Sequence, residues 1–137
     1  MIEFHFEKEV EISDTDGIGK WIADLILNES YRLDTINYIF CSDEDLLKRN
    51  VEFLKHDTLT DIISFDYTMG KLIAGDIFIS VERIEENATE FGVTFLEELH
   101  RVMAHGVLHY CGYKDKTPED KKEMRMKEDY YLSLRKI

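Results

Sequence analysis

The stretch DIISFDYTMGKLIAGDIFIS, residues 61–80, carries the pattern that decides the fold. Its two arms, 61–67 and 71–80, are rich in β-branched and aromatic residues, which favours β-strands. Between them stands the pair Met69-Gly70, and a glycine at such a point is typical of a tight turn. We therefore expect a β-hairpin that contributes two neighbouring strands to a sheet.

Outside this hairpin, strand and helix signals follow one another along the chain. Ile2, Phe4 and Phe6 alternate with polar residues and predict a strand with one buried face, and TINYIFCS, residues 35–42, predicts another. Helical spacing and start signals predict five helices. The first runs through Trp21 and Ile26 after an N-cap at Asp14 or Asp16, and the next three cover residues 42–54, 81–90 and 94–111. The last begins at Thr117-Pro118, and its buried stripe consists of Met124, Tyr131 and Leu134. This irregular mixture indicates an α+β fold in a single domain, residues 1–137, with about four strands and about five helices.

The composition is that of a soluble globular protein. Apolar residues make up 44% and charged residues 34% of the 137 residues, and no apolar run reaches membrane-spanning length. Cys41 and Cys111 are too few for a disulfide framework. We therefore expect a cytoplasmic protein that contacts no membrane.

The charge of the chain bears on its partners. Seventeen Lys and Arg against 29 Asp and Glu give a net charge of −12, which repels polyanions at long range. Basic residues nevertheless gather in one segment: Lys114, Lys116, Lys121, Lys122, Arg125 and Lys127. This segment is either a solvated face that balances nearby acids or a local anion-binding surface.

The sequence HGVLHYCGYKD, residues 105–115, has the spacing of a metal site. Residues four apart lie on the same face of a helix, so Arg101, His105 and His109 form one stripe near the end of the helix. Gly112 can adopt the left-handed conformation that ends a helix, and the reversed chain then brings Asp115 back toward the two imidazoles. Three protein ligands leave the fourth position of a tetrahedral ion for water, which is typical of a catalytic zinc site.

Each candidate ligand also has a simpler interpretation. His105 and His109 can end a helix without binding an ion, and Asp115 can be an ordinary turn residue. The same H-x-x-x-H-x-x-G-x-x-D spacing occurs in metzincin proteases, but such enzymes need a carboxylate base where this chain has Gly106. A protease is therefore disfavoured.

The residues resemble those of a known family in three blocks. HGVLHYCGYKD resembles the H-G-x-L-H-x-x-G-Y-D-H motif of the YbeY family, bacterial rRNA maturation factors described as zinc-dependent endoribonucleases. TLTDIISFD, residues 58–66, is similar to the family segment P-T-D-V-L-S-F, and AGDIFIS, residues 74–80, to its L-G-D-I-x-I-S, in the family's order. The resemblance implies an α+β fold with a mixed sheet of about four strands, and one zinc ion per chain.

Two positions depart from the family pattern. The third metal ligand of the family is a histidine, and the aligned residue here is Asp115, whose charge makes metal-bound water harder to deprotonate and favours harder ions. An arginine that precedes the T-D-V-L-S-F segment in the family aligns with Leu54. A substrate phosphate therefore has Lys55, His56 or Arg101 as its candidate contacts.

These residues lead to one functional hypothesis with two alternatives. We expect an endoribonuclease of rRNA maturation and ribosome quality control, which uses metal-assisted hydrolysis with Arg101 at the substrate phosphate, while the general base is not identified. Asp61 and Asp76 either orient a ligand histidine or cap loops. The expected partners are ribosomal RNA or ribosomal particles, and proteins of ribosome assembly. The alternatives are a ribosome-assembly binding factor with a structural metal, and a small-molecule metallohydrolase.

Overall fold

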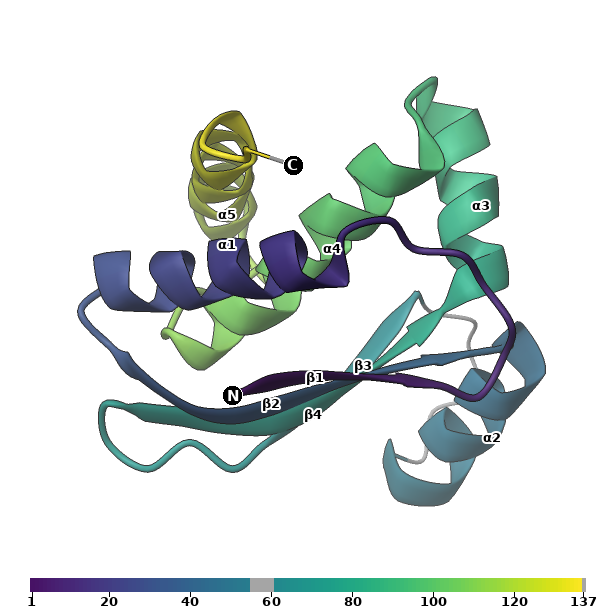
Figure 1. Ribbon diagram of the computed structural model, residues 1–137, viewed down its shortest axis with the longest axis horizontal. Coiled ribbons are helices and arrows are strands. Elements are labelled where there is room, and N and C mark those ends of the chain that lie inside the picture. Colours follow the sequence, from purple (N-terminus) through teal and green to yellow (C-terminus); the bar gives the residue numbers. More distant parts are fainter. Residues whose placement is uncertain (55–60, 137) are drawn as a thin grey trace.

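A computed structural model describes residues 1–54 and 61–136 and shows a four-stranded sheet between helices (Figure 1). The strands are β1 (Ile2–Phe6), β2 (Arg32–Cys41), β3 (Ile62–Asp66) and β4 (Leu72–Ser80). The helices within these ranges are α1 (Thr15–Asn28), α2 (Asp43–Leu54), α3 (Val81–Phe91), α4 (Phe95–Tyr110) and α5 (Pro118–Ser133). These elements confirm the α+β fold expected from the sequence.

The sheet is mixed, and its order is β1-β2-β4-β3. β1, β2 and β4 run parallel, whereas β3 is antiparallel to β4 and pairs with it from Ile62 opposite Ile79 to Asp66 opposite Gly75. The turn between them contains Gly70 at φ 59°, a left-handed conformation that suits glycine. The predicted hairpin is therefore confirmed, and it forms one edge of the sheet.

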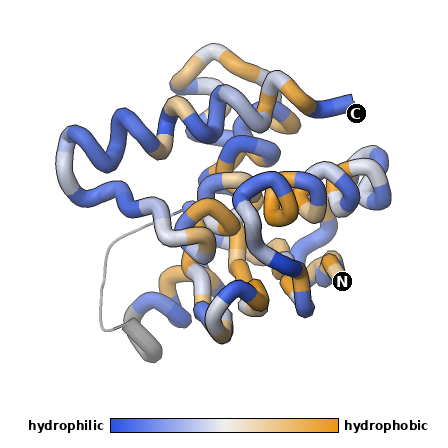
Figure 2. The backbone as a smooth tube through the Cα atoms, turned by 90° about the vertical axis from the view of Figure 1, so that its left-hand side faces the viewer, coloured by the Kyte–Doolittle hydropathy of each residue, from blue (hydrophilic) through white to orange (hydrophobic). Residues whose placement is uncertain are grey.

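The helices cover the two faces of the sheet unequally. Figure 1 shows α1, α3 and α4 on one face and α2 on the other, while α5 packs on α4 at the side away from the sheet. The main apolar core lies where the sheet meets α1 and α4, and includes Tyr38, Phe40, Ile77, Ile22 and Met103. In Figure 2 the hydrophobic stretches gather in the middle of the molecule, and many outward-facing helical turns are hydrophilic. α4 is thus buried from two sides.

Close contacts fix α4 on the sheet. An added Cβ on Gly106 would lie 3.1 Å from the Cδ1 atoms of both Ile62 and Ile77, so the missing side chain lets the helix approach β3 and β4. The hydroxyl of Tyr38 donates to the carbonyl of Met103 at 3.0 Å. Because these contacts fix α4 near Met103 and Gly106, the residues on the opposite side of the same turns have a defined position.

Two packing details of the sequence prediction are wrong. Leu134 follows the end of α5 and is 48% exposed, whereas Leu132 is buried beside Met124 and Tyr131. The helix ends before Leu134 can turn back to the core. Phe6 is also 48% exposed, because it ends the edge strand β1, where its ring stacks on that of Phe40.

We expect Gly75→Ala to destabilise the fold. Its Cβ would lie 2.6 Å from the carbonyl oxygen of Phe65 and would clash with the hydroxyl of Tyr110, so the free energy of unfolding should fall by about 1–3 kcal/mol. Urea unfolding measures this difference. Gly19→Ala is the matched control, because an added Cβ in α1 meets no atom closer than 3.9 Å and should stabilise by roughly 0.5–1 kcal/mol. Equal stability of Gly75→Ala and the wild type would contradict the expectation.

Candidate metal centre

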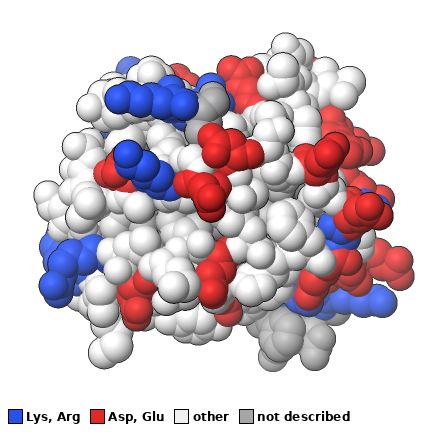
Figure 3. All heavy atoms as spheres, viewed as in Figure 1, with Lys and Arg blue, Asp and Glu red and all other residues white. Residues whose placement is uncertain are grey.

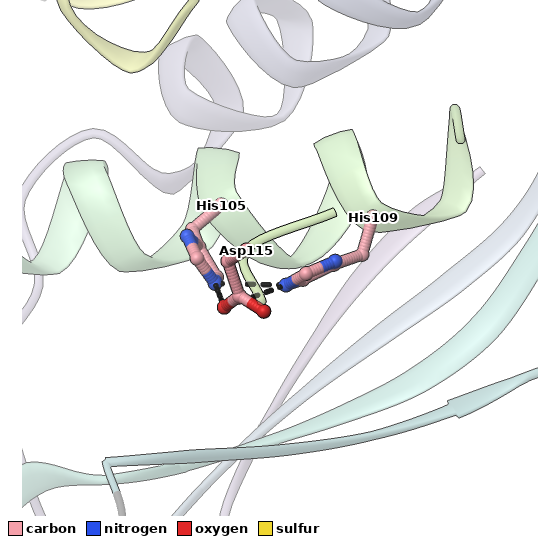
Figure 4. A group of neighbouring side chains, drawn as sticks. All are labelled: His105, His109 and Asp115. Carbon is pink, nitrogen blue, oxygen red and sulfur yellow. Dashed lines mark hydrogen bonds and ion pairs between the residues drawn. The ribbon is translucent and has the colours of Figure 1, made fainter. Parts of the chain in front are cut away.

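His105, His109 and Asp115 converge on one point. The two histidines lie one turn apart on α4, and Asp115 lies in the segment that follows the helix (Figure 4). One carboxylate oxygen, Asp115 Oδ2, is 3.2 Å from Nε2 of His105 and 3.3 Å from Nε2 of His109. The two Nε2 atoms are 2.9 Å apart. The three side chains that the spacing predicted to meet do lie together, at half-buried positions.

The reversal after α4 brings Asp115 to this point. The amide N–H groups of Gly112 and Tyr113 donate to the carbonyls of His109 and Leu108, at 3.0 and 3.1 Å. Gly112 has φ 98°, which a residue with a side chain rarely adopts, so the glycine is needed to turn the chain. Asp115 therefore runs back beside the last turn of the helix.

The outer nitrogen of each imidazole is held by a hydrogen bond. Nδ1 of His105 donates to Oε2 of Glu128 at 2.7 Å, and Nδ1 of His109 donates to the backbone carbonyl of Tyr113 at 2.9 Å. Carboxylate and carbonyl oxygens are acceptors, so the Nδ1 atoms carry the hydrogens, and in a neutral ring the Nε2 atom presents its lone pair.

This donor set fits a divalent cation. Two ring lone pairs and a carboxylate oxygen face one another within 4.8 Å, and each of these atoms is an acceptor that repels the others without a positive charge among them. Imidazole and carboxylate suit zinc and other divalent ions, and a hydrogen bond at the second ring nitrogen is the usual support of a metal-bound histidine. Among the described residues, no other group of this kind is present.

The charge around His105 favours a cation. Burial alone lowers the pKa of His105, but the hydrogen bond and negative charge of Glu128, with the charges of Asp115 and Asp61, outweigh it and raise that pKa. The site therefore stabilises positive charge at the ring, whether a proton or a metal ion supplies it.

Glu128 connects His105 to Arg101. Its other oxygen, Oε1, accepts from Nη1 of Arg101 at 2.9 Å, and Nη2 of Arg101 contacts Asp129 at 2.7 Å. Arg101 is thus on the ligand stripe, as its spacing predicted, but its guanidinium is bound to two carboxylates of α5. A role of Arg101 at a substrate phosphate stays a prediction.

Sequence reasoning missed Glu128 and named other carboxylates instead. Asp76 hydrogen-bonds Asn37 and does not orient a ligand histidine, whereas Asp61 lines the cleft beside His105. Glu128 lies between Met124 and Tyr131 on the buried stripe of α5. A charged residue at a position where the helical spacing predicts an apolar one was the sequence signal that could have identified it.

The proposed phosphate contacts Lys55 and His56 lie outside the described residues. Cys111 is buried, and burial raises the pKa of its thiol to about 12, so the thiol stays protonated near neutral pH.

Residues 3–135 match the model of one protein family, described as Endoribonuclease YbeY. The chain belongs to the YbeY family. Curated family members similar to it include Endoribonuclease YbeY of Flavobacterium johnsoniae, 55% identical over 98% of this chain and 96% of the relative. The same-named protein of Flavobacterium psychrophilum is 54% identical over the same shares. A solution structure of TM1509 from Thermotoga maritima matches with a TM-score of 0.72 and 28% identity, over 97% of this chain and 87% of the other.

Membership of the YbeY family places the observed site in the context of RNA-cleaving enzymes. The sequence resembled the family in the metal-site motif and in the two arms of the hairpin, and in the structure Gly106 of that motif packs against Ile62 of β3 and Ile77 of β4. Within residues 1–54 and 61–136, no helix is both long enough and apolar enough to span a bilayer.

We expect Glu128→Gln to weaken metal binding by roughly 10- to 100-fold, the usual effect of losing a hydrogen-bond partner of a metal-bound histidine. The amide keeps the shape of the side chain but loses the charge that holds the proton on Nδ1 of His105. Competition with a chromophoric chelator measures the affinity, and circular dichroism checks folding. Glu123→Gln, on the exposed face of the same helix, should bind as the wild type does. Equal affinity of both variants would exclude this role of Glu128.

Proposed function

We propose that this protein is a zinc-dependent endoribonuclease that acts on ribosomal RNA in rRNA maturation and ribosome quality control. The observation that carries the proposal is the convergence of His105, His109 and Asp115, with both Nδ1 atoms already bound by Glu128 and the Tyr113 carbonyl. A preorganised set of three ligands is the arrangement of catalytic zinc sites, which keep an open position. The family membership supplies the reaction class, the hydrolysis of RNA phosphodiester bonds.

The residues of the chain have distinct roles in this proposal. A bound divalent ion would supply Lewis acidity toward a phosphoryl oxygen and would make a bound water more acidic. His105, His109 and Asp115 hold the ion, and Glu128 keeps the His105 ring in the tautomer that directs Nε2 inward. Arg101 lines the same cleft as His105 and Asp115, which supports its proposed contact with the substrate phosphate.

Basic residues lie near the proposed ligands on an otherwise acidic body. Figure 3 shows acidic side chains on the face of the molecule that carries α3, a helix that contains Glu82, Glu85, Glu86 and Glu90. The segment that follows α4 and begins α5 has more exposed basic than exposed acidic residues: Lys114, Lys116, Lys121, Lys122 and Arg125 against Glu119 and Glu123. Because exposed charges act mainly within about 8–10 Å at physiological salt, these basic residues are the proposed contacts for RNA on a chain with a net charge of −12.

We expect the purified protein to carry about one metal ion per chain and to cleave single-stranded RNA until a chelator removes the ion. His109→Ala should lower cleavage on the order of 100-fold or more, because one ligand and its charge stabilisation are lost. Elemental analysis and a labelled-RNA cleavage assay measure the two quantities. His5→Ala is the control, since His5 is exposed on β1 and hydrogen-bonds only Asn37 among the described residues.

The outcome of this experiment also tests the alternative function. Cleavage that survives complete metal removal would refute the metal-dependent mechanism. A protein that holds its ion and binds ribosomal particles, without cleaving RNA and without an effect of His109→Ala, would instead be a binding factor with a structural metal.

We expect Asp115→His to move the acidic limb of the pH–rate profile of RNA cleavage to lower pH. A neutral third ligand leaves more positive charge on the ion, so bound water loses its proton more easily. The same variant should prefer zinc over manganese more strongly than the wild type does, because imidazole is the softer ligand. Cleavage rates from pH 5 to 9 with each ion test both expectations, and an unchanged profile would show that Asp115 does not contact the ion.

A further inference from the structure

A cleft leads from the metal ligands along the free face of α4. Its volume is about 290 Å³. The residues that line it come from α4, α5, the segment after α4 and the start of the hairpin: Asp61, Ile62, Glu98, Arg101, Val102, His105, Asp115 and Glu128. Two of these residues, His105 and Asp115, are ligands of the proposed ion. Asp61, Ile62, Glu98 and Val102 neither bind that ion nor contact the substrate phosphate in the proposed function.

Glu98 is the unusual residue of this cleft. It is only 6% exposed, yet no hydrogen bond or ion pair reaches its side chain from the residues that the structure describes. Burial raises the pKa of Glu98, and the nearby carboxylate of Asp61 raises it further. Arg101 and Arg125 lower that pKa, but they do not reverse the shift. The ionised carboxylate is therefore poorly stabilised by the protein alone and would gain from N–H donors.

A second metal ion is a poor explanation of this carboxylate. Three potential ligand atoms within 4.8 Å of one another occur, in the described part of the chain, only at His105, His109 and Asp115. Ile62 and Val102 add apolar surface to a cleft that ionisable side chains otherwise line, and an organic group with polar edges can contact both kinds of residue. A planar group with N–H donors on its edge would contact Ile62 and Val102 with its face and Glu98 with its edge.

The distance from the metal ligands suits one nucleotide. Glu98 precedes His105 by seven residues, so the two lie on the same face of α4, about 10 Å apart along the axis at 1.5 Å per residue. This length is close to the span between the phosphate of a nucleotide and the far edge of its base. A phosphate at the His105 end of the cleft would therefore place its base near Glu98.

We propose that this cleft is a base-binding subsite, in which Glu98 accepts hydrogen bonds from a guanine next to the cleaved phosphate. The proposal rests on the RNA-cleaving function proposed above. Single-stranded RNA is read through unstacked bases that are bound at their edges. Guanine presents two adjacent N–H groups on its Watson–Crick edge, which match the two oxygens of one carboxylate. Adenine and cytosine offer one amino group there, and uracil offers one imino group.

Binding of the four nucleoside 5′-monophosphates to the metal-loaded protein tests the subsite directly. We expect GMP to bind roughly tenfold or more tightly than AMP, CMP or UMP, the discrimination typical of a bidentate contact to a base. Glu98→Gln should remove this preference without changing the metal content, because the amide retains only one acceptor oxygen. Glu90→Gln, the same change at an exposed position on α3, should keep it.

A second readout is the cleavage of RNA oligonucleotides that carry one guanine at different positions. Cut sites should follow the guanine in the wild type and lose this dependence in Glu98→Gln. Asp61→Asn provides a second variant if Glu98→Gln does not fold. It should weaken GMP binding less than the loss of the Glu98 carboxylate does, because Glu98 still accepts the hydrogen bonds of the base. Equal binding of all four nucleotides by the wild type would overturn the proposal.

Failure of the proposed function and failure of the subsite give different results. Selective GMP binding that is abolished in Glu98→Gln, in a protein that cleaves no RNA, supports the subsite and refutes the nuclease. Metal-dependent cleavage with no base preference, together with equal nucleotide binding, supports the nuclease and refutes the subsite.

Discussion

The hydrogen bonds at the outer nitrogens of two histidines are the constraint on which the site depends. An imidazole can direct either nitrogen inward, and its ring can rotate, so two histidines one turn apart do not by themselves form a binding site. Glu128 and the carbonyl of Tyr113 each accept the Nδ1 hydrogen, which leaves both Nε2 atoms as acceptors that face Asp115. The three acceptors are thereby held against their mutual repulsion, and that arrangement has low free energy only when a cation lies among them.

The fold positions these groups through two glycines with different tasks. Gly106 lies between the two histidines in sequence but faces the sheet, where only a residue without a side chain lets α4 approach Ile62 and Ile77. Gly112 instead turns the chain at the end of the helix, so that the Tyr113 carbonyl and Asp115 reach the last turn. The first glycine fixes the helix on the sheet, and the second brings the third ligand to the helix.

Local patterns predicted what local geometry determines. The i, i+4 spacing of His105 and His109 and the glycine after them were sufficient to place three side chains together, and the Met69-Gly70 turn was sufficient for the hairpin. Glu128 was not found, because it lies on another helix and reaches His105 only through the way α5 crosses α4. The unusual environment of Glu98 was likewise invisible, since its burial and its neighbour Asp61 come from tertiary packing.

The acidity of the protein and an RNA substrate are compatible because of where the charges lie. Arg101 forms ion pairs with Glu128 and Asp129. The other three carboxylates that line the cleft, those of Asp61, Glu98 and Asp115, form no ion pair with Arg101. The two imidazoles add no positive charge when they bind an ion, because a ligand nitrogen must be unprotonated. The cleft by itself therefore repels a phosphate, and a divalent ion at the triad would reverse the sign at the one position where the phosphate must come close. Repulsion elsewhere in the cleft would then favour the uncharged base over a second phosphate, so that a single nucleotide is held in one orientation.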